Sequence, residues 1–141
     1  MRVLLDTNIV LDLLLAREPF LQSAKEIFLM VENRIIEGFL SATSIVTLHY
    51  LIGKQNGRDE ANRVIEDLLE LFEITPVDKD ILLKASANNG IDYEDSVIYT
   101  AAEKNSVDII VSRDTKGFKR SKVAVMMPDT FLAGVKIGKL H

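Results

Sequence analysis

The sequence predicts an α/β protein built on a parallel β-sheet. Short apolar runs alternate along the 141 residues with longer segments whose apolar residues recur at helical spacing, a pattern typical of strands and helices that take turns. We find no internal repeat, low-complexity stretch or linker. Because this length is typical of one domain, we expect a single domain over residues 1–141.

Five apolar runs are short enough to be strands. Pro76 ends the third of them or places it at an edge, because proline cannot donate a ladder hydrogen bond. The runs are Arg2–Leu5, Ile35–Leu40, Glu73–Val77, Asp108–Ser112 and Lys122–Met126.

Seven segments between and after these runs predict helices. Capping residues precede several of them, and Asn89-Gly90 stops the fifth. The predicted helices are Ile9–Ala16, Phe20–Val31, Ser41–Leu51, Ala61–Phe72, Asp80–Asn88, Asp92–Lys104 and one that opens at Pro128-Asp129.

Composition excludes several classes of protein. The absence of cysteine rules out disulfides and thiolate metal sites, and it fits a cytoplasmic location. A net charge of −4 argues against a protein that coats nucleic acid, but it allows a nuclease with an acidic metal site. Asp6 and Asp12 interrupt the first apolar stretch, so we expect no signal peptide, and no run approaches the roughly 20 residues that span a membrane.

Four aspartates are expected at one edge of the sheet. Asp6 follows the first strand directly, Asp114 comes two residues after the fourth, and Asp92 and Asp95 open a helix. In parallel sheets, ligands bind beyond the carboxyl ends of the strands. Carboxylates held close together repel, and a bound Mg²⁺ or Mn²⁺ offsets that repulsion. The sequence therefore predicts a divalent-metal site that does not depend on His, Cys or Ser.

Each of these acids also has an ordinary structural interpretation. Asp6 and Asp92 are favoured helix caps, Asp95 suits a first helical turn, and Asp114 suits a turn. The basic segment after Asp114 fits a polyanionic substrate, yet it is equally typical of a solvated loop. That segment contains Arg113, Lys116, Lys119, Arg120 and Lys122.

The ordered motifs resemble those of PIN-domain nucleases. The opening Val3–Asn8 (VLLDTN), the central Asp92–Asp95 (DYED), and Ile109–Asp114 (IIVSRD) followed by Gly117-Phe118 match the family in order and spacing. Met127-Pro128 ahead of Phe131-Leu132 resembles the usual ending. The resemblance covers essentially the whole chain.

This resemblance implies a three-layer α/β/α sandwich around a parallel sheet of four to five strands. It also implies a metal-dependent endoribonuclease with Mg²⁺ or Mn²⁺ as cofactor. Asp6, Asp95 and Asp114 match the first, third and fourth family acids, and Asp92 matches an additional acid of one subgroup. Many small members are toxins that dimerise and are inhibited by an antitoxin, so an antitoxin and a homodimer are expected partners alongside the RNA substrate.

One family acid is missing. The second acid is usually a Glu in the helix after the second strand, but Ser41–Gly57 contains no Asp or Glu, and Thr47 stands at about the expected place. Asp92 could compensate as a ligand. Glu37 lies nearby in sequence, but on a strand we expect it to point elsewhere.

Three hypotheses follow. In the leading one, Asp6, Asp92, Asp95 and Asp114 hold the metal. Asn8 and Thr47 orient a ligand or water, Ser112 supports a carboxylate, and Arg113 and Lys116 contact the RNA backbone. The second is a non-catalytic PIN-like module that binds RNA or protein. The third, a phosphatase with an aspartyl nucleophile, is disfavoured because Asn8 stands where such enzymes place a second Asp.

Overall fold

Five parallel strands form the centre of the protein. The computed structural model describes residues 1–88 and 90–138. The strands are β1 (Arg2–Leu5), β2 (Glu37–Ser41), β3 (Glu73–Thr75), β4 (Ile109–Val111) and β5 (Ala124–Met126), in the order β3-β2-β1-β4-β5. The predicted parallel sheet is confirmed, and β3, which Pro76 follows, lies at an edge.

The seven predicted helices are present, and most differ from the prediction only at their ends. Helix α1 begins at Thr7 because the Asp6 carboxylate caps it, accepting from the Thr7 N–H at 2.8 Å. The stop predicted at Asn89-Gly90 falls partly outside the described residues, because Asn89 is not among them. The helices are α1 (Thr7–Leu14), α2 (Leu21–Glu32), α3 (Ala42–Asn56), α4 (Arg58–Leu71), α5 (Lys79–Ala87), α6 (Tyr93–Lys104) and α7 (Pro128–Lys136), with a 3-10 turn η1 (Thr115–Phe118).

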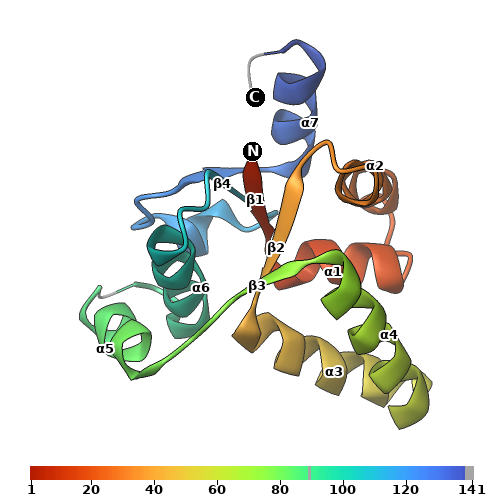
Figure 1. Ribbon diagram of the computed structural model, residues 1–141, viewed down its shortest axis with the longest axis horizontal. Helices are drawn as coiled ribbons and strands as arrows, with labels where there is room; N and C mark the ends of the chain where they lie inside the picture. The colour runs from red at the N-terminus through yellow and green to blue at the C-terminus, as the bar shows by residue number, and fades with distance from the viewer. Residues whose placement is uncertain (89, 139–141) are drawn as a thin grey trace.

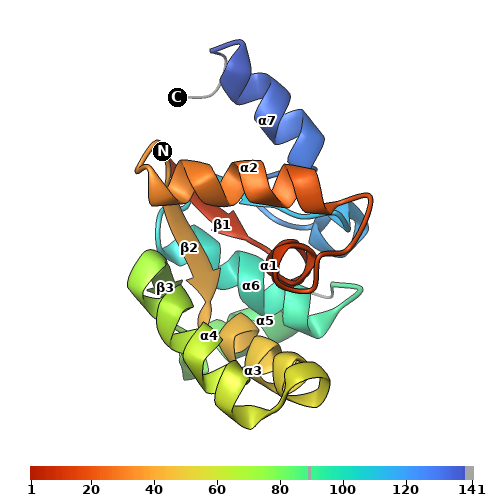
Figure 2. The same ribbon diagram turned by 90° about the vertical axis from the view of Figure 1, so that its right-hand side faces the viewer.

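Side chains alternate across the central strands and so build two apolar layers. Val3 and Leu5 face a core shared with α1, α2, α4 and α7, whereas Leu4 and Ile110 face α6. Helix α5 packs outside α6. Figure 1 shows α5 and α6 on one side of the sheet and α1, α2 and α4 on the other. Figure 2 shows α2 crossing in front of the strands and α1 seen nearly end-on near the end of β1. The expected three-layer sandwich is confirmed.

The order of the strands places the candidate acids. Strand β1 lies between β2 and β4, and Leu5 is in register with Val111. The Asp6 N–H donates to the Val111 carbonyl at 3.0 Å, so the chain leaves β1 and β4 side by side. This is the switch point at which open α/β sheets bind ligands. None of the described helices combines the length and apolar character needed to cross a bilayer.

Candidate metal centre

Asp6 belongs to a cluster of acidic side chains, hereafter the acidic crevice, that consists of Asp6, Asp92, Glu94, Asp95 and Asp114. Its carboxylate is 6% exposed and accepts from the Ser112 hydroxyl at 2.7 Å. The same hydroxyl accepts from the Asp114 N–H at 3.0 Å. Ser112 therefore ties the first acid to the backbone of the last, which confirms its predicted bond to a carboxylate. The cap interpretation of Asp6 is correct, and its role as a metal ligand stays a prediction.

Burial and neighbouring carboxylates act together on the acids. Burial raises the pKa of Asp6, the bonds from Ser112 and Thr7 lower it, and Glu94 and Asp114 raise it further. Burial also raises the pKa of half-buried Asp95 to about 7, with repulsion from Asp6, Asp92, Asp114 and Glu94 adding to the effect. The structure thus brings together all four predicted aspartates and a fifth acid, Glu94.

Asp92 and Asp95 occupy one helical turn. Asp92 caps α6 by accepting from the Asp95 N–H at 3.1 Å, so its predicted capping role is confirmed. Gly117 of η1 lies against Asp95, since a Cβ built on that glycine would meet Asp95 Oδ2 at 2.0 Å. Because only glycine leaves this space, η1 can approach the carboxylate closely.

Glu94 contacts Thr47, the residue that stands at about the place of the missing family acid. The Thr47 hydroxyl on α3 donates to Glu94 Oε1 at 3.3 Å. Thr47 therefore does reach the crevice, but through Glu94. The sequence contained a signal for this, namely three acids within the four residues Asp92–Asp95 beside a helix that has none. Glu37 pairs with Arg2 at the opposite end of the sheet, as expected.

Arg113 forms an ion pair within the protein. Its guanidinium donates to both oxygens of Asp12, at 2.7 and 3.0 Å, and stacks over the Phe20 ring with its Cζ 3.8 Å from the centroid. Arg17 donates to the same carboxylate at 3.0 Å. The contact of Arg113 with RNA stays a prediction, and an ion pair between α1 and the β4–η1 turn already uses this guanidinium. Lys116, in contrast, is exposed.

Comparisons with known proteins agree with this fold. A family model described as PIN domain matches residues 2–116. The chain belongs to the PIN-domain family. Among curated PIN relatives, Ribonuclease VapC1 of Aquifex aeolicus (strain VF5) is 25% identical over 136 residues, covering 92% of each chain.

Solved structures share the same fold. FitAcB from Neisseria gonorrhoeae matches with a TM-score of 0.69 and 24% identity, over 89% of this chain and 97% of that one. A toxin–antitoxin complex from Klebsiella pneumoniae matches with a TM-score of 0.67 and 21% identity, over 89% and 97%. These likenesses support the PIN fold.

The donor set of this PIN domain fits a hard divalent cation. Carboxylate oxygens are the ligands that Mg²⁺ and Mn²⁺ prefer. The buried Asn8 Oδ1, two residues after Asp6, has no hydrogen-bond partner among the described residues, so it remains available to water or a ligand. Within residues 1–88 and 90–138, no group of three or more His, Asp or Glu side chains is arranged so that it could hold a metal ion. Mg²⁺ does not need such a group, because it keeps several waters.

The raised pKa of Asp95 predicts a pH-dependent stability in the metal-free protein. Its folded pKa of about 7 lies above its ordinary value of 3.8. The stabilisation is therefore fully present below about pH 4 and is lost as the pH rises through 7. Relative to Asp95→Asn, the wild type in EDTA should lose melting temperature between about pH 5 and pH 8. A melting-temperature difference that is equal at both pH values contradicts this prediction.

Gly117→Ala is expected to disturb the acids and leave the fold intact. The new methyl would overlap Asp95 Oδ2, so the carboxylate must turn away. We expect divalent-ion affinity, measured by calorimetry, to fall about 10- to 100-fold, the usual cost of disturbing the support of a metal ligand. Gly53→Ala on α3 is the matched control, because its methyl would meet only Ala61 Cβ at 3.8 Å. Equal affinities of the two variants would refute the contact.

Proposed function

We propose that this chain is a divalent-metal-dependent endoribonuclease. The observation that carries the proposal is the convergence of Asp6, Asp95, Asp114 and Glu94 at the switch point of a PIN fold. The name of the curated relative, Ribonuclease VapC1, supports RNA as the substrate. A non-catalytic module remains the alternative, but the fifth acid weakens the reason for it.

Asp6, Asp95 and Asp114 would hold Mg²⁺ or Mn²⁺, with Asp92 binding directly or through water. When bound, such an ion activates water and offsets the charge that develops on a transferring phosphoryl group. Ser112 keeps Asp6 oriented by donating to Oδ2. The free Asn8 Oδ1 would accept a hydrogen bond from water, and exposed Lys116 would contact a phosphate of the RNA.

Glu94 would take the place of the absent second acid. It faces Thr47 of α3, the helix that usually supplies this acid, and it raises the pKa of both Asp6 and Asp95. We expect Glu94→Gln to weaken Mn²⁺ binding about 10-fold or more in calorimetry. Glu66→Gln, an exposed change on α4, should bind as the wild type does. Identical binding by both variants would remove Glu94 from the site.

A cleavage assay tests the central proposal. Single-stranded RNA is incubated with the protein and Mg²⁺ or Mn²⁺, with EDTA, and with EDTA followed by excess metal. We expect internal cuts with metal, none with EDTA, and recovery after metal is restored. Cleavage that persists in EDTA, or intact RNA bound tightly in Mn²⁺, would refute the proposal and favour the binding module.

We further propose that the chain is a single-domain cytoplasmic toxin that dimerises and is neutralised by an antitoxin protein. The toxin–antitoxin complex among its structural neighbours supports such a partner, and exposed Val46 and Tyr50 on α3 offer apolar contact surface. Expression in bacteria should arrest growth, and co-expression of the adjacent reading frame should relieve the arrest. Light scattering should give twice the mass of the chain. Normal growth under strong expression, or a monomer at high concentration, would contradict these expectations.

A further inference from the structure

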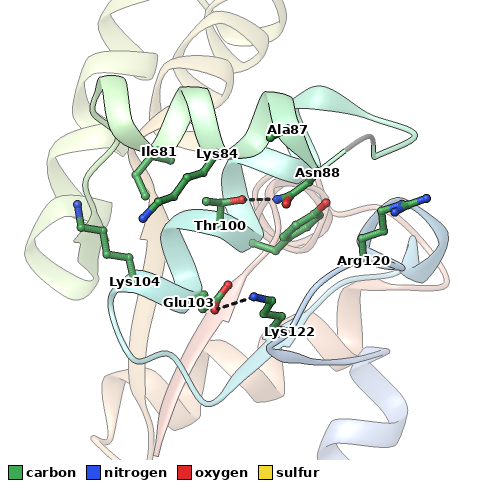
Figure 3. A pocket seen from close by; sticks show the side chains of 10 residues that line it. Ile81, Lys84, Ala87, Asn88, Thr100, Glu103, Lys104, Arg120 and Lys122 are labelled. Carbon is green, nitrogen blue, oxygen red and sulfur yellow. Dashed lines mark hydrogen bonds and ion pairs between the residues drawn. The ribbon is translucent and has the colours of Figure 1, made fainter.

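A basic hollow lies on the α5–α6 side of the molecule, and none of the candidate metal-binding acids lines it. It has a volume of about 450 Å³ and lies between α5, α6 and the loop that leads into β5. Figure 3 shows Lys84 and Lys104 on one side of it and Arg120 on the other. Lys122 completes four cationic side chains, whereas Glu103 is the one carboxylate among the lining residues.

A smaller hollow lies next to this one and shares Arg120 with it. It has a volume of about 220 Å³, and its lining includes Lys116, Gly117, Lys119 and Arg120. Arg120 lines both hollows, and Gly117 lies against the Asp95 carboxylate. The two hollows are therefore neighbours, and the smaller one reaches the glycine that packs against Asp95. We call the two hollows together the basic tract, and its cations are Lys84, Lys104, Lys116, Lys119, Arg120 and Lys122.

The cations nearest the crevice are free to bind an anion. Among the described residues, no carboxylate lies within 4.0 Å of Lys116, Lys119 or Arg120, and all three are exposed. Farther along, Lys122 pairs loosely with Glu103 at 3.9 Å and Lys84 pairs with Asp80 at 3.1 Å. These pairs are solvent-exposed and cost little to exchange for a phosphate.

The floor of the larger hollow favours recognition of a backbone over recognition of bases. Its one aromatic ring, Tyr99, is 2% exposed and offers no stacking platform. The polar groups on the floor are Asn88 and Thr100, and they are bonded to each other at 3.0 Å. Binding here would depend on charge and be tolerant of sequence, as it is for phosphate contacts generally.

We propose that the basic tract binds the sugar-phosphate backbone of the RNA segment that flanks the scissile bond. The inference rests on the proposed function, because it takes the acidic crevice as the point of cleavage. The protein is acidic overall, so a local track of cations is needed to bring a polyanion to a cluster of carboxylates. The basic tract supplies these cations from three segments, namely α5, α6 and the stretch from Lys116 to Lys122.

Salt-dependent binding tests the tract without requiring cleavage. In an Asp6→Asn background with EDTA, a fluorescent oligouridylate is titrated with protein at several salt concentrations, and anisotropy reports binding. The pair Lys119→Gln/Arg120→Gln removes two cations that have no carboxylate partner. The pair Lys54→Gln/Arg58→Gln removes the same charge from α3 and α4, where no carboxylate partner is lost either.

Two lost phosphate contacts should reduce the slope of log affinity against log salt by about 1.4, since each contact on a single strand contributes about 0.7. At about 0.1 M salt the affinity should fall roughly 20-fold. The control pair should keep the original slope, because charges beyond about 10 Å are screened at that salt concentration.

The outcomes separate the tract from the proposed function. The tract proposal is overturned if both double variants lose the same RNA affinity, or if Lys119→Gln/Arg120→Gln loses none. The second result is also the one expected if the basic tract binds an acidic protein segment and not RNA. If the wild type fails to cut RNA but the tract pair still loses affinity selectively, the endoribonuclease proposal fails and the tract stands. If the wild type cuts RNA and the tract pair binds normally, only the tract fails.

Discussion

Asp6→Asn should reduce RNA cleavage by at least about 100-fold, because even residues that only support a metal ligand contribute 10- to 100-fold. Asn keeps the cap of α1, since Asn and Asp are comparable caps. It also removes one of the charges that raise the pKa of Asp95. The variant should therefore fold at least as stably as the wild type while losing activity. Initial cleavage rates with saturating Mn²⁺, together with melting temperatures, measure both effects.

Asp67→Asn is the matched control for this experiment. It makes the same chemical change on an exposed part of α4, where Asp67 pairs with Arg63 at 3.4 Å. Its cleavage rate should equal that of the wild type. If Asp6→Asn retains more than a tenth of the activity, Asp6 does not hold a catalytic metal. A large drop in melting temperature would instead assign Asp6 a mainly structural role.

Asp12→Asn should cost about 3 kcal/mol of unfolding free energy. The Asp12 side chain is 2% exposed and accepts from both Arg17 and Arg113. Breaking a buried ion pair typically costs 3–5 kcal/mol, and the partial exposure of the two guanidinium groups places this case at the lower end. An amide offers one acceptor oxygen to three N–H donors, so bonds are lost whichever way it turns.

Urea denaturation followed by circular dichroism measures this loss. Asp67→Asn again serves as the control, since an exposed pair contributes at most about 1 kcal/mol. An unfolding free energy for Asp12→Asn within about 0.5 kcal/mol of wild type would show that the Asp12 cluster is not needed for stability.

The sequence was sufficient for the fold because its signals are local. Each strand is an apolar run bounded by breakers, and each helix has an apolar face or a cap that sets its start, as Asp6 and Asp92 do. The parallel topology alone was enough to predict at which edge of the sheet the acids lie. Residues that follow parallel strands emerge at the same edge of a sheet, so the sequence predicts that Asp6 and Asp114 lie at that edge.

The sequence does not show which side chains from different elements contact one another. Arg113 lies in a basic segment and looked like a solvent-facing cation, but its partner Asp12 lies 101 positions away on another element. Glu94 was visible within the central acidic motif, yet only the tertiary structure shows that it accepts a hydrogen bond from Thr47 of α3. The close approach of Gly117 to Asp95 also depends on tertiary geometry, since glycine in a turn has many other uses.

The pairing of β1 with β4 has a consequence for how the protein is made. Asp6 and Ser112 touch although 106 positions separate them, so the crevice has no local precursor within the chain. Contacts between residues so far apart in the sequence form late in folding, because the chain must first bear the entropy cost of closing a large loop. In a chain that is still being synthesised, Asp6 and Asp114 therefore stay separated until β4 has emerged from the ribosome and joined the sheet. The cell that makes this protein meets an assembled acidic centre only when synthesis of the domain is nearly complete.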